Sequence, residues 1–289
     1  FGHNAIWVRD FANGIDTLYN YGRFSFEEEN FILQFIQGHM RYWVEAQDPA
    51  VTFQFYQFMN RSIHVQELAL NLDQRISLRD FLEWNIKPEN MFYNYDYYTD
   101  NCSTRLRDAI DSVVNGEIKH QTYTTPTDLT FRFHTQRLVA QSPWLYTALL
   151  LVLGNSVDQV ITVWEDMFIP MTLREHIRTV MISGENGTLV PLVAREHTVF
   201  EGTTLLADDK PSFWIVWYLL CGITVAMLFL VLERFARGNC FARVAFVGVT
   251  GLWTIMIGVG GMLLAGLWFL TDHFDSAHNE NLFFVTPLA

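Results

Sequence analysis

The sequence is short of basic residues. Its 289 residues include 19 Lys and Arg against 31 Asp and Glu, which gives a formal net charge of −12. Nucleic-acid binding depends on clustered Lys and Arg that contact phosphates. The composition therefore argues against a nucleic-acid partner.

Spacing typical of metal ligands is missing as well. The 9 His residues form no H-x-x-x-H pattern, which is the usual sign of a zinc enzyme. The sequence also has no internal repeat and no low-complexity tract. We therefore expect neither a bound metal nor a repeat architecture.

Long apolar runs occur only in the last third of the chain. Residues 213–232 carry no charge and are long enough to cross about 30 Å of hydrocarbon. A second uncharged run covers residues 244–270, and as one helix it would span roughly 40 Å, so it would tilt or kink. The sequence predicts at least two transmembrane helices.

The charges around these runs predict their orientation. Arg234, Arg237 and Arg243 lie between the runs, and the positive-inside rule places such a loop in the cytoplasm. Residues 1–210 would then form a periplasmic domain of a multi-pass protein in a bacterial inner membrane. Residues 211–289 would form the transmembrane domain.

Cysteine is scarce, with 3 in the chain. Cys221 lies in the first apolar run and Cys240 in the loop after it, so neither can readily pair with Cys102 across the bilayer. An unpaired thiol in an oxidising compartment is a liability unless it has a chemical role. Cys102 is thus a candidate nucleophile, and the alternative is a small buried structural residue.

The pattern of residues 1–210 mixes strands and helices, which indicates an α+β domain. Aromatic and β-branched residues predict strands, and capping residues with a helical apolar period predict helices. The expected strands cover residues 3–11, 14–24, 40–47 and 52–70. The expected helices cover residues 25–38 (capped by Ser25 or a neighbour), 73–86, 102–116, 142–154, 157–168 and 170–181, and residues 188–200 form a strand or an extended linker.

Cys102 falls in the first turn of an amphipathic helix that Gly116 ends. Asp100, Asn101 and Ser103 are candidate caps. Free N–H groups and the helix dipole favour an anion there, so we expect the pKa of the thiol to be lowered. Its base would be a histidine that is adjacent in space, and spacing alone does not choose among His3, His39, His64, His120, His134, His176 and His197.

Four motifs carry a resemblance to a known family. They are "FGHNAIWV", "YNYGRFSF", "NRSIHVQELAL" and "YNYDYYTDNCSTRLRD", and together they resemble the N-terminal periplasmic domain of the Lnb-type bacterial lipoprotein N-acyltransferases. The later "SPWLYTALLLVLGNSVDQ" and the apolar runs are similar to that family too. The order of His before Cys also resembles circularly permuted papain-like enzymes (the NlpC and lecithin:retinol acyltransferase groups).

The resemblance implies a site and a reaction. Cys102 would be the nucleophile, His3 its base and Asn20 the orienting residue, with Tyr19 or Tyr21 in its place if the strand register differs by one. Cys102 would take an acyl chain from a membrane phospholipid as a thioester and pass it to the N-terminal amine of a diacylglyceryl-cysteine lipoprotein. No cofactor is implied. Because the family usually has more spans, we expect this sequence to be truncated at both ends.

Two other functions remain open. A papain-like thiol hydrolase would cut cell-wall peptides or lipid esters, and a non-catalytic membrane-anchored envelope protein would need Cys102 only for packing. Arg105 and Arg107 fit a solvated helix face better than a phosphate site. His273 and His278 fit ordinary loop positions better than a role at the site.

Overall fold

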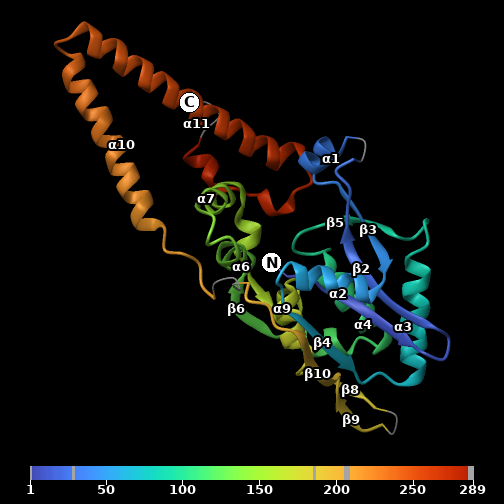
Figure 1. Ribbon diagram of the computed structural model, residues 1–289. Coiled ribbons are helices and arrows are strands. Elements are labelled where there is room, and N and C mark those ends of the chain that lie inside the picture. The colour runs from blue at the N-terminus through green and yellow to red at the C-terminus, as the bar shows by residue number, and fades with distance from the viewer. Residues whose placement is uncertain (1, 28–29, 185–186, 205–208, 286–289) are drawn as a thin grey trace. The chain divides into compact units, whose positions relative to one another are not determined.

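The computed structural model describes residues 2–27, 30–184, 187–204 and 209–285 (Figure 1). Contacts divide the chain into two units. The first comprises residues 1–131 and 160–207, and the second comprises residues 132–159 and 208–289. Residues 132–159, which we had placed with the periplasmic part, thus group with the C-terminal segment.

A four-stranded antiparallel sheet lies at the centre of the first unit. The expected hairpin is confirmed, because Ala5 pairs with Asn20 and Asp10 with Ile15. In order across the sheet, the strands are β1 (Ala5–Asp10), β2 (Ile15–Arg23), β3 (Met40–Gln47) and β5 (Phe92–Tyr95).

The alternation of β2 settles which residues face the core. Tyr19 and Tyr21 are fully buried and donate hydrogen bonds to Glu83 and Asn85 of α3 (Leu72–Asn85). Successive side chains point to opposite faces of a strand, so Asn20 points away from these tyrosines. The two tyrosines belong to the core and Asn20 to the other face.

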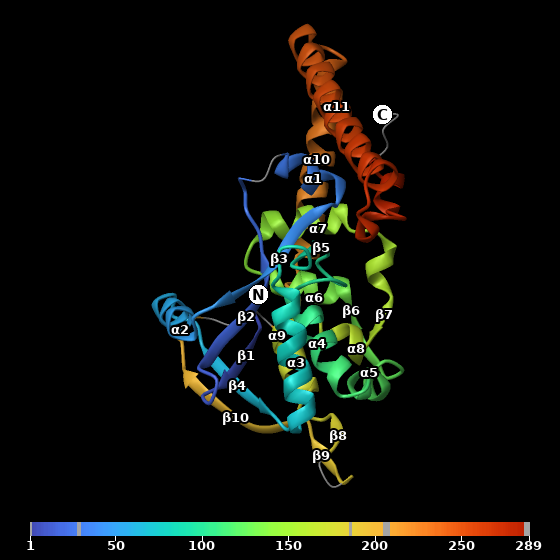
Figure 2. The same ribbon diagram turned by 90° about the vertical axis from the view of Figure 1, so that its right-hand side faces the viewer.

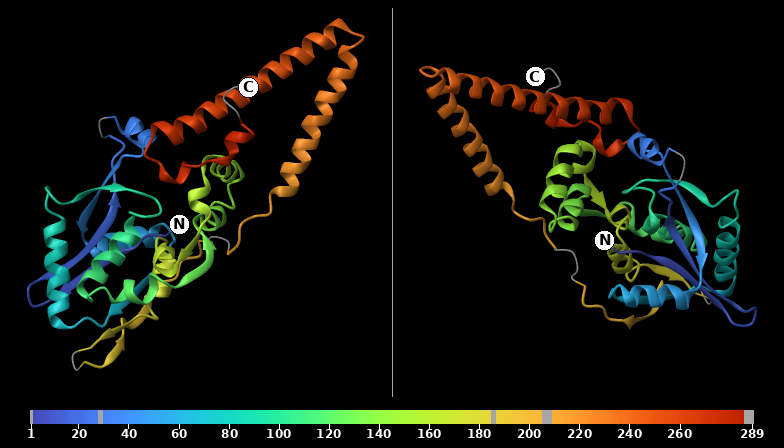
Figure 3. Two further views of the ribbon diagram at one scale, coloured as in Figure 1. Left: turned by 180° about the vertical axis from the view of Figure 1, so that it is seen from behind. Right: turned by 45° about the horizontal axis from the view of Figure 1, so that its top comes forward.

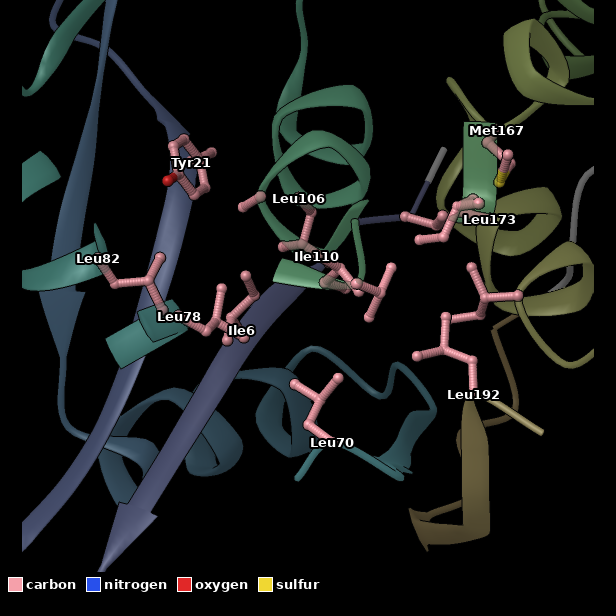
Figure 4. Close-up of a cluster of buried hydrophobic side chains, with 14 of the residues drawn as sticks. Ile6, Tyr21, Leu70, Leu78, Leu82, Leu106, Ile110, Met167, Leu173 and Leu192 are labelled. Carbon is pink, nitrogen blue, oxygen red and sulfur yellow. The ribbon is translucent and has the colours of Figure 1, made fainter. Parts of the chain in front are cut away.

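Two helices pack on the tyrosine side of the sheet. They are α3 (Leu72–Asn85) and α4 (Cys102–Val113), and Figure 2 shows them on the side of β1 and β2 opposite to α2 (Pro49–Phe58). Leu106 and Ile110 of α4 lie in the middle of the buried apolar cluster, between Leu82 of α3 and Leu192 (Figure 4). The amphipathic pattern of α4 thus anchors Cys102 at its N-terminal end.

Three sequence predictions need correction. Helix α1 (Phe31–Gln37) has Asn30 as its N-cap, so Ser25 does not cap it, although Gly38 ends it as expected. Residues 52–58 were predicted as strand because their aromatic residues alternate with polar ones. They are helical because Asp48 caps α2 and Pro49 occupies its first turn.

The third correction concerns residues 157–168, which we predicted as one helix. Within this range, β7 (Val160–Thr162) precedes the single-turn helix α8 (Val163–Asp166). Thr162 caps α8 in a reciprocal bond with Glu165, so the helix can begin only after the strand.

The remaining elements of the first unit frame the core. Strand β4 (Ile63–Leu68) pairs with β10 (Val193–Phe200), which establishes a strand where we had left strand or linker open. The others are α5 (Glu117–Thr122), β6 (Pro126–Thr130), α9 (Pro170–His176), β8 (Met181–Ser183) and β9 (Leu189–Pro191). Gly116 precedes α5, while α4 ends at Val113.

The second unit contains two long helices, α10 (Ile215–Ala236) and α11 (Cys240–Leu270), joined by a short turn (Figure 3). Both are long and apolar enough to cross a membrane. Its shorter helices are α6 (Phe131–Leu138), α7 (Pro143–Val152), η1 (Asn155–Asp158), η2 (Phe274–Ser276) and η3 (Glu280–Phe283). The chain is thus a mixed α/β protein with two candidate membrane helices, as the sequence predicted.

The segment after α11 folds back onto α7. The Asn279 amide donates to the carbonyl oxygens of Leu151 (2.7 Å) and Val152 (2.8 Å) at the end of α7. The Gly154 N–H donates to the backbone carbonyl of Asp275. A side chain on Gly154 would lie 1.9 Å from the backbone oxygen of Ala277, so this approach requires glycine.

Candidate active site

Cys102 is the first residue of α4, as predicted. Of the candidate caps, Asn101 performs the role: its side-chain oxygen accepts from the N–H groups of Ser103 (2.8 Å) and Thr104 (3.1 Å). The Thr104 hydroxyl accepts in return from the Asn101 N–H. Two of the free N–H groups of the first turn are therefore already used, and the Cys102 N–H remains.

The pKa of the Cys102 thiol is raised, contrary to our expectation. Burial of the thiol is the largest cause, because it disfavours the charged thiolate. Hydrogen bonding from the Asn4 backbone and from Ser103 opposes this effect without overcoming it. Cys102 is thus a neutral thiol near neutral pH and needs a base to remove its proton.

His3 lies beside Asn20, as the expected register requires. The His3 Nε2 and the Asn20 Oδ1 are 3.0 Å apart, and the Asn20 amide donates to Gln47 Oε1 at 2.6 Å. Burial lowers the pKa of His3, Arg61 and Arg23 lower it further, and the Asn20 contact opposes them. His3 is therefore a neutral imidazole that can accept a proton.

Asn4, the neighbour of His3, contacts the start of α4. The Asn4 amide donates to the Ser103 hydroxyl at 3.1 Å, and the Asn4 backbone hydrogen-bonds to the Cys102 sulfur. Within the described part of the chain, His3 and Cys102 form no direct hydrogen bond. Asn4 is thus held against the first turn of α4, in contact with both Cys102 and Ser103.

Gly22 of β2 lies next to Cys102, since a β-carbon on Gly22 would be 3.6 Å from the Cys102 Cβ. The pairing of β2 with β3 shifts register between Asn20 and Arg23, and Gly22 there has a φ of +91°. Such bulges redirect a strand and are common beside active sites. Glycine tolerates this backbone conformation, which other residues rarely adopt.

Tyr93 is a further candidate that sequence reasoning did not single out. Its hydroxyl group is buried and its O–H has no acceptor among the described residues, while the Gly22 backbone N–H hydrogen-bonds to its oxygen. Burial raises the pKa of Tyr93, and the nearby Cys102 raises it further. Its oxygen also lies 4.0 Å from where a Gly22 side chain would be. Only its place in an aromatic run could have indicated it.

A hollow of about 550 Å³ opens beside His3 and Asn20. One wall is α2, whose Val51, Thr52, Phe55 and Tyr56 line it. Val51 and Phe55 are 65% and 57% exposed, so the hollow offers an apolar surface next to the polar pair.

The other candidates have structural surroundings. Arg105 pairs with Asp100. Arg107 is buried, donates to the Trp164 carbonyl at 2.7 Å and stacks on its ring, so the expected solvated face is wrong for Arg107. The remaining two, His273 and His278, belong to the second unit. The described residues contain no group of three or more His, Cys, Asp or Glu placed to hold a metal.

Comparison with known proteins bears on residues 1–141, which match the model of the Lnb N-terminal periplasmic domain. Neither the curated proteins nor the solved structures gave a match. Both motifs that carry His3 and Cys102 lie inside the matched range. A periplasmic domain together with two candidate membrane helices indicates a membrane protein. The resemblance to the Lnb family is therefore confirmed over residues 1–141, the part of the chain that matches the Lnb N-terminal periplasmic domain.

Proposed function

We propose that this protein is a membrane-anchored thiol acyltransferase that acylates lipoproteins. Its donor is a membrane phospholipid and its acceptor is the N-terminal amine of a diacylglyceryl-cysteine. One observation carries the proposal: Cys102 begins α4 beside the segment that holds the His3 and Asn20 pair, and this pair lines an open hollow of an Lnb domain.

In the first step Cys102 takes the acyl chain from the lipid. His3 accepts the thiol proton, and the sulfur attacks the ester carbonyl carbon. The carbon–sulfur bond forms as the carbon–oxygen ester bond breaks. The lysophospholipid leaves as an alcohol with the proton from His3. Hydrogen bonds between catalytic groups often tighten only when substrate binds, so the separate resting positions of His3 and Cys102 fit this step.

In the second step the chain moves to the lipoprotein. The neutral α-amine attacks the thioester carbonyl, the nitrogen–carbon bond forms and the carbon–sulfur bond breaks. The amine proton passes through His3 back to the Cys102 sulfur. The enzyme returns to its neutral thiol and imidazole, and an amide is the product.

In both steps the attacked carbonyl oxygen becomes negatively charged and needs hydrogen-bond donors to stabilise it. Since Asn101 occupies the Ser103 and Thr104 N–H groups, we assign this role to the Cys102 N–H and the Tyr93 hydroxyl. The Tyr93 O–H is buried near Cys102 and has no acceptor among the described residues, while its oxygen accepts from the Gly22 backbone N–H. Donors that are oriented in advance in this way contribute strongly to catalysis.

The surroundings suit lipid substrates. The exposed Val51 and Phe55 of α2 offer a surface for an acyl chain. The proposed placement is the bacterial inner membrane, with α10 and α11 as spans, their arginine-containing connection in the cytoplasm and the first unit in the periplasm. For the site itself we propose a permuted papain-like fold, because His3, just before the first strand, precedes in the sequence a helix that begins with Cys102.

Mass spectrometry of a diacylated lipoprotein, incubated with phospholipid and the full chain, tests the function. Wild type should add one acyl group to the N-terminal amine. Cys102→Ala should abolish the addition, whereas Cys221→Ser should keep it, because Cys221 lies in α10. A thioester on Cys102 should appear when the lipoprotein is omitted.

The same experiment separates the other functions. Lysophospholipid and free fatty acid without lipoprotein acylation would instead indicate a hydrolase with Cys102 as nucleophile. If a folded wild-type chain changes neither lipid nor lipoprotein, the acyltransferase proposal is wrong and a non-catalytic envelope protein is favoured.

A further inference from the structure

A chain of hydrogen bonds leads from His3 across the sheet. The Asn20 amide donates to Gln47 Oε1 at 2.6 Å, and the Gln47 amide donates to Glu45 Oε2 at 2.9 Å. Arg23 pairs with the same Glu45 oxygen at 2.8 Å. The cross-strand pairing of Asn20 with Glu45 places all these side chains on one face of β2 and β3.

The direction of this chain is fixed at its far end. A carboxylate only accepts hydrogen bonds, and Arg23 donates to the same Glu45 oxygen. Gln47 must therefore turn its NH₂ group toward Glu45 and its oxygen toward Asn20. Asn20 must then turn its NH₂ group toward Gln47 and its oxygen toward His3.

Reversal of the Gln47 amide is unfavourable at both of its ends. The Thr52 hydroxyl of α2 lies 3.3 Å from the same Gln47 oxygen, but its single hydrogen has a shorter contact, 3.0 Å, with the Asp48 carbonyl, so the orientation depends on Asn20 and Glu45. If the Gln47 amide were reversed, its NH₂ group would face the Asn20 NH₂ group and its oxygen would face the Glu45 carboxylate. Both contacts would be repulsive, and a partly buried polar group that loses its partner is costly.

We propose that Gln47 and Glu45 are positioning residues that hold His3 with its proton on Nε2, leaving Nδ1 free to accept the Cys102 proton. That Nδ1 accepts the proton of Cys102 rests on the function proposed above. Asn20 Oδ1 can only accept, so the Nε2 it faces must carry hydrogen. A neutral imidazole has one N–H, and the other nitrogen is then bare. Neither Gln47 nor Glu45 acts on a substrate atom, since their effect passes through Asn20.

Nitrogen NMR of the full chain, labelled with ¹⁵N-histidine in detergent micelles, tests the positioning directly. The His3 signals are identified as those that His3→Gln removes. In wild type, Nε2 should carry the proton and Nδ1 should be unprotonated. In Gln47→Leu the Asn20 amide is free to reverse, so the Nδ1–H form should appear.

The chain offers a matched control. Gln66 of β4 also donates to a glutamate, Glu196, at 2.9 Å, and it does not line the hollow. Gln66→Leu therefore removes the same kind of contact outside the path to His3. It should leave the His3 tautomer and the transfer rate unchanged.

Exchanging the two residues should rescue the single change. In Glu45→Gln/Gln47→Glu, the new amide at position 45 can donate to the new carboxylate at position 47, which still accepts from Asn20. Gln47→Leu should lower kcat about tenfold or more with little change in KM, because general-base catalysis contributes about 10²–10⁴-fold when the base is oriented. The exchange should restore most of that loss and the Nε2–H form.

Two results would overturn the inference: an Nδ1–H form in wild type, or an unchanged His3 tautomer in Gln47→Leu. Failure of the proposed function is distinguishable from these. If wild type lacks transferase activity but holds the Nε2–H form, and Gln47→Leu loses it, the positioning stands and the acyltransferase proposal is contradicted.

Discussion

Gly22 and Cys102 are in direct proximity across the gap between β2 and α4. A β-carbon added to Gly22 would lie 3.6 Å from the Cβ of Cys102, which is ordinary van der Waals contact. The approach depends on the bulge in β2 and on the left-handed backbone of Gly22. The bulge thereby places the backbone of β2, the strand that carries Asn20, in contact with Cys102.

Gly22→Ala should therefore affect both stability and the thiol. A residue other than glycine in this backbone region costs about 1–3 kcal/mol, so the thermal unfolding midpoint should fall by several degrees. The added methyl group should also slow alkylation of Cys102 by iodoacetamide, measured by mass spectrometry of the peptide that contains Cys102.

Gly14→Ala is the matched control. Gly14 also has a positive φ, +68°, but a side chain there would meet nothing within 4 Å. It should lose similar stability and keep the wild-type alkylation rate. Equal slowing in both variants would show that the effect is general loosening and not contact with the thiol.

The second prediction concerns the pH dependence of Cys102. Because burial raises the pKa of the thiol above its ordinary 9.0, little thiolate is present near neutral pH. The iodoacetamide alkylation rate should keep rising with pH through and beyond 9.0. A rate that levels off near neutral pH, as for a preformed thiolate–imidazolium pair, would contradict a resting neutral thiol.

The third prediction concerns Tyr93. Tyr93→Phe removes the hydroxyl that we assign to the charged oxygen, and should lower kcat about 10²–10³-fold with little change in KM. Stability should change little, since the buried O–H has no acceptor to lose and only the Gly22 backbone N–H loses its contact with the oxygen. Tyr21→Phe is the comparison, because the Tyr21 hydroxyl already donates to Asn85. It should lower stability and leave kcat near wild type.

The sequence predicted those parts of the fold that local pattern controls. Alternation in β1 and β2, the apolar period of α4 and the two long apolar runs each gave the observed element. The failure at α2 has a local cause too: the alternating aromatic residues resemble a strand, and only Asp48 and Pro49 reveal the helix. Local pattern could not reveal that β4 pairs with the distant β10.

The candidate site was only partly accessible to sequence reasoning. Cys102 followed from its helix start, while His3 and Asn20 depended on the family resemblance. The predicted direction of the Cys102 pKa shift was wrong, because burial of the thiol arises from tertiary packing, which cannot be deduced from its position at a helix start. Gln47 could not be identified at all, since its contact with Asn20 exists only after two strands pair.

The last prediction concerns the cap of α4. Asn101 accepts two N–H groups of the first turn, and its NH₂ group donates to the buried carbonyls of Tyr97 (2.8 Å) and Phe168 (2.9 Å). Asn101→Asp keeps the cap, because aspartate caps as well as asparagine. It removes both donated bonds and adds a negative charge next to Cys102. Stability should fall by about 2 kcal/mol or more, and alkylation should slow because the new charge disfavours the thiolate.

Asn71 provides the control for the charge effect, since it caps α3 in the same reciprocal arrangement. Asn71→Asp should stay near wild type in both thermal unfolding and Cys102 alkylation. Faster alkylation in Asn101→Asp would show that loss of the contacts with Tyr97 and Phe168 makes the thiol more accessible, and that this effect outweighs the effect of the new charge on the thiolate. The reactivity of the resting Cys102 thiol would then depend on how easily the reagent reaches it at the start of α4, and less on nearby charges.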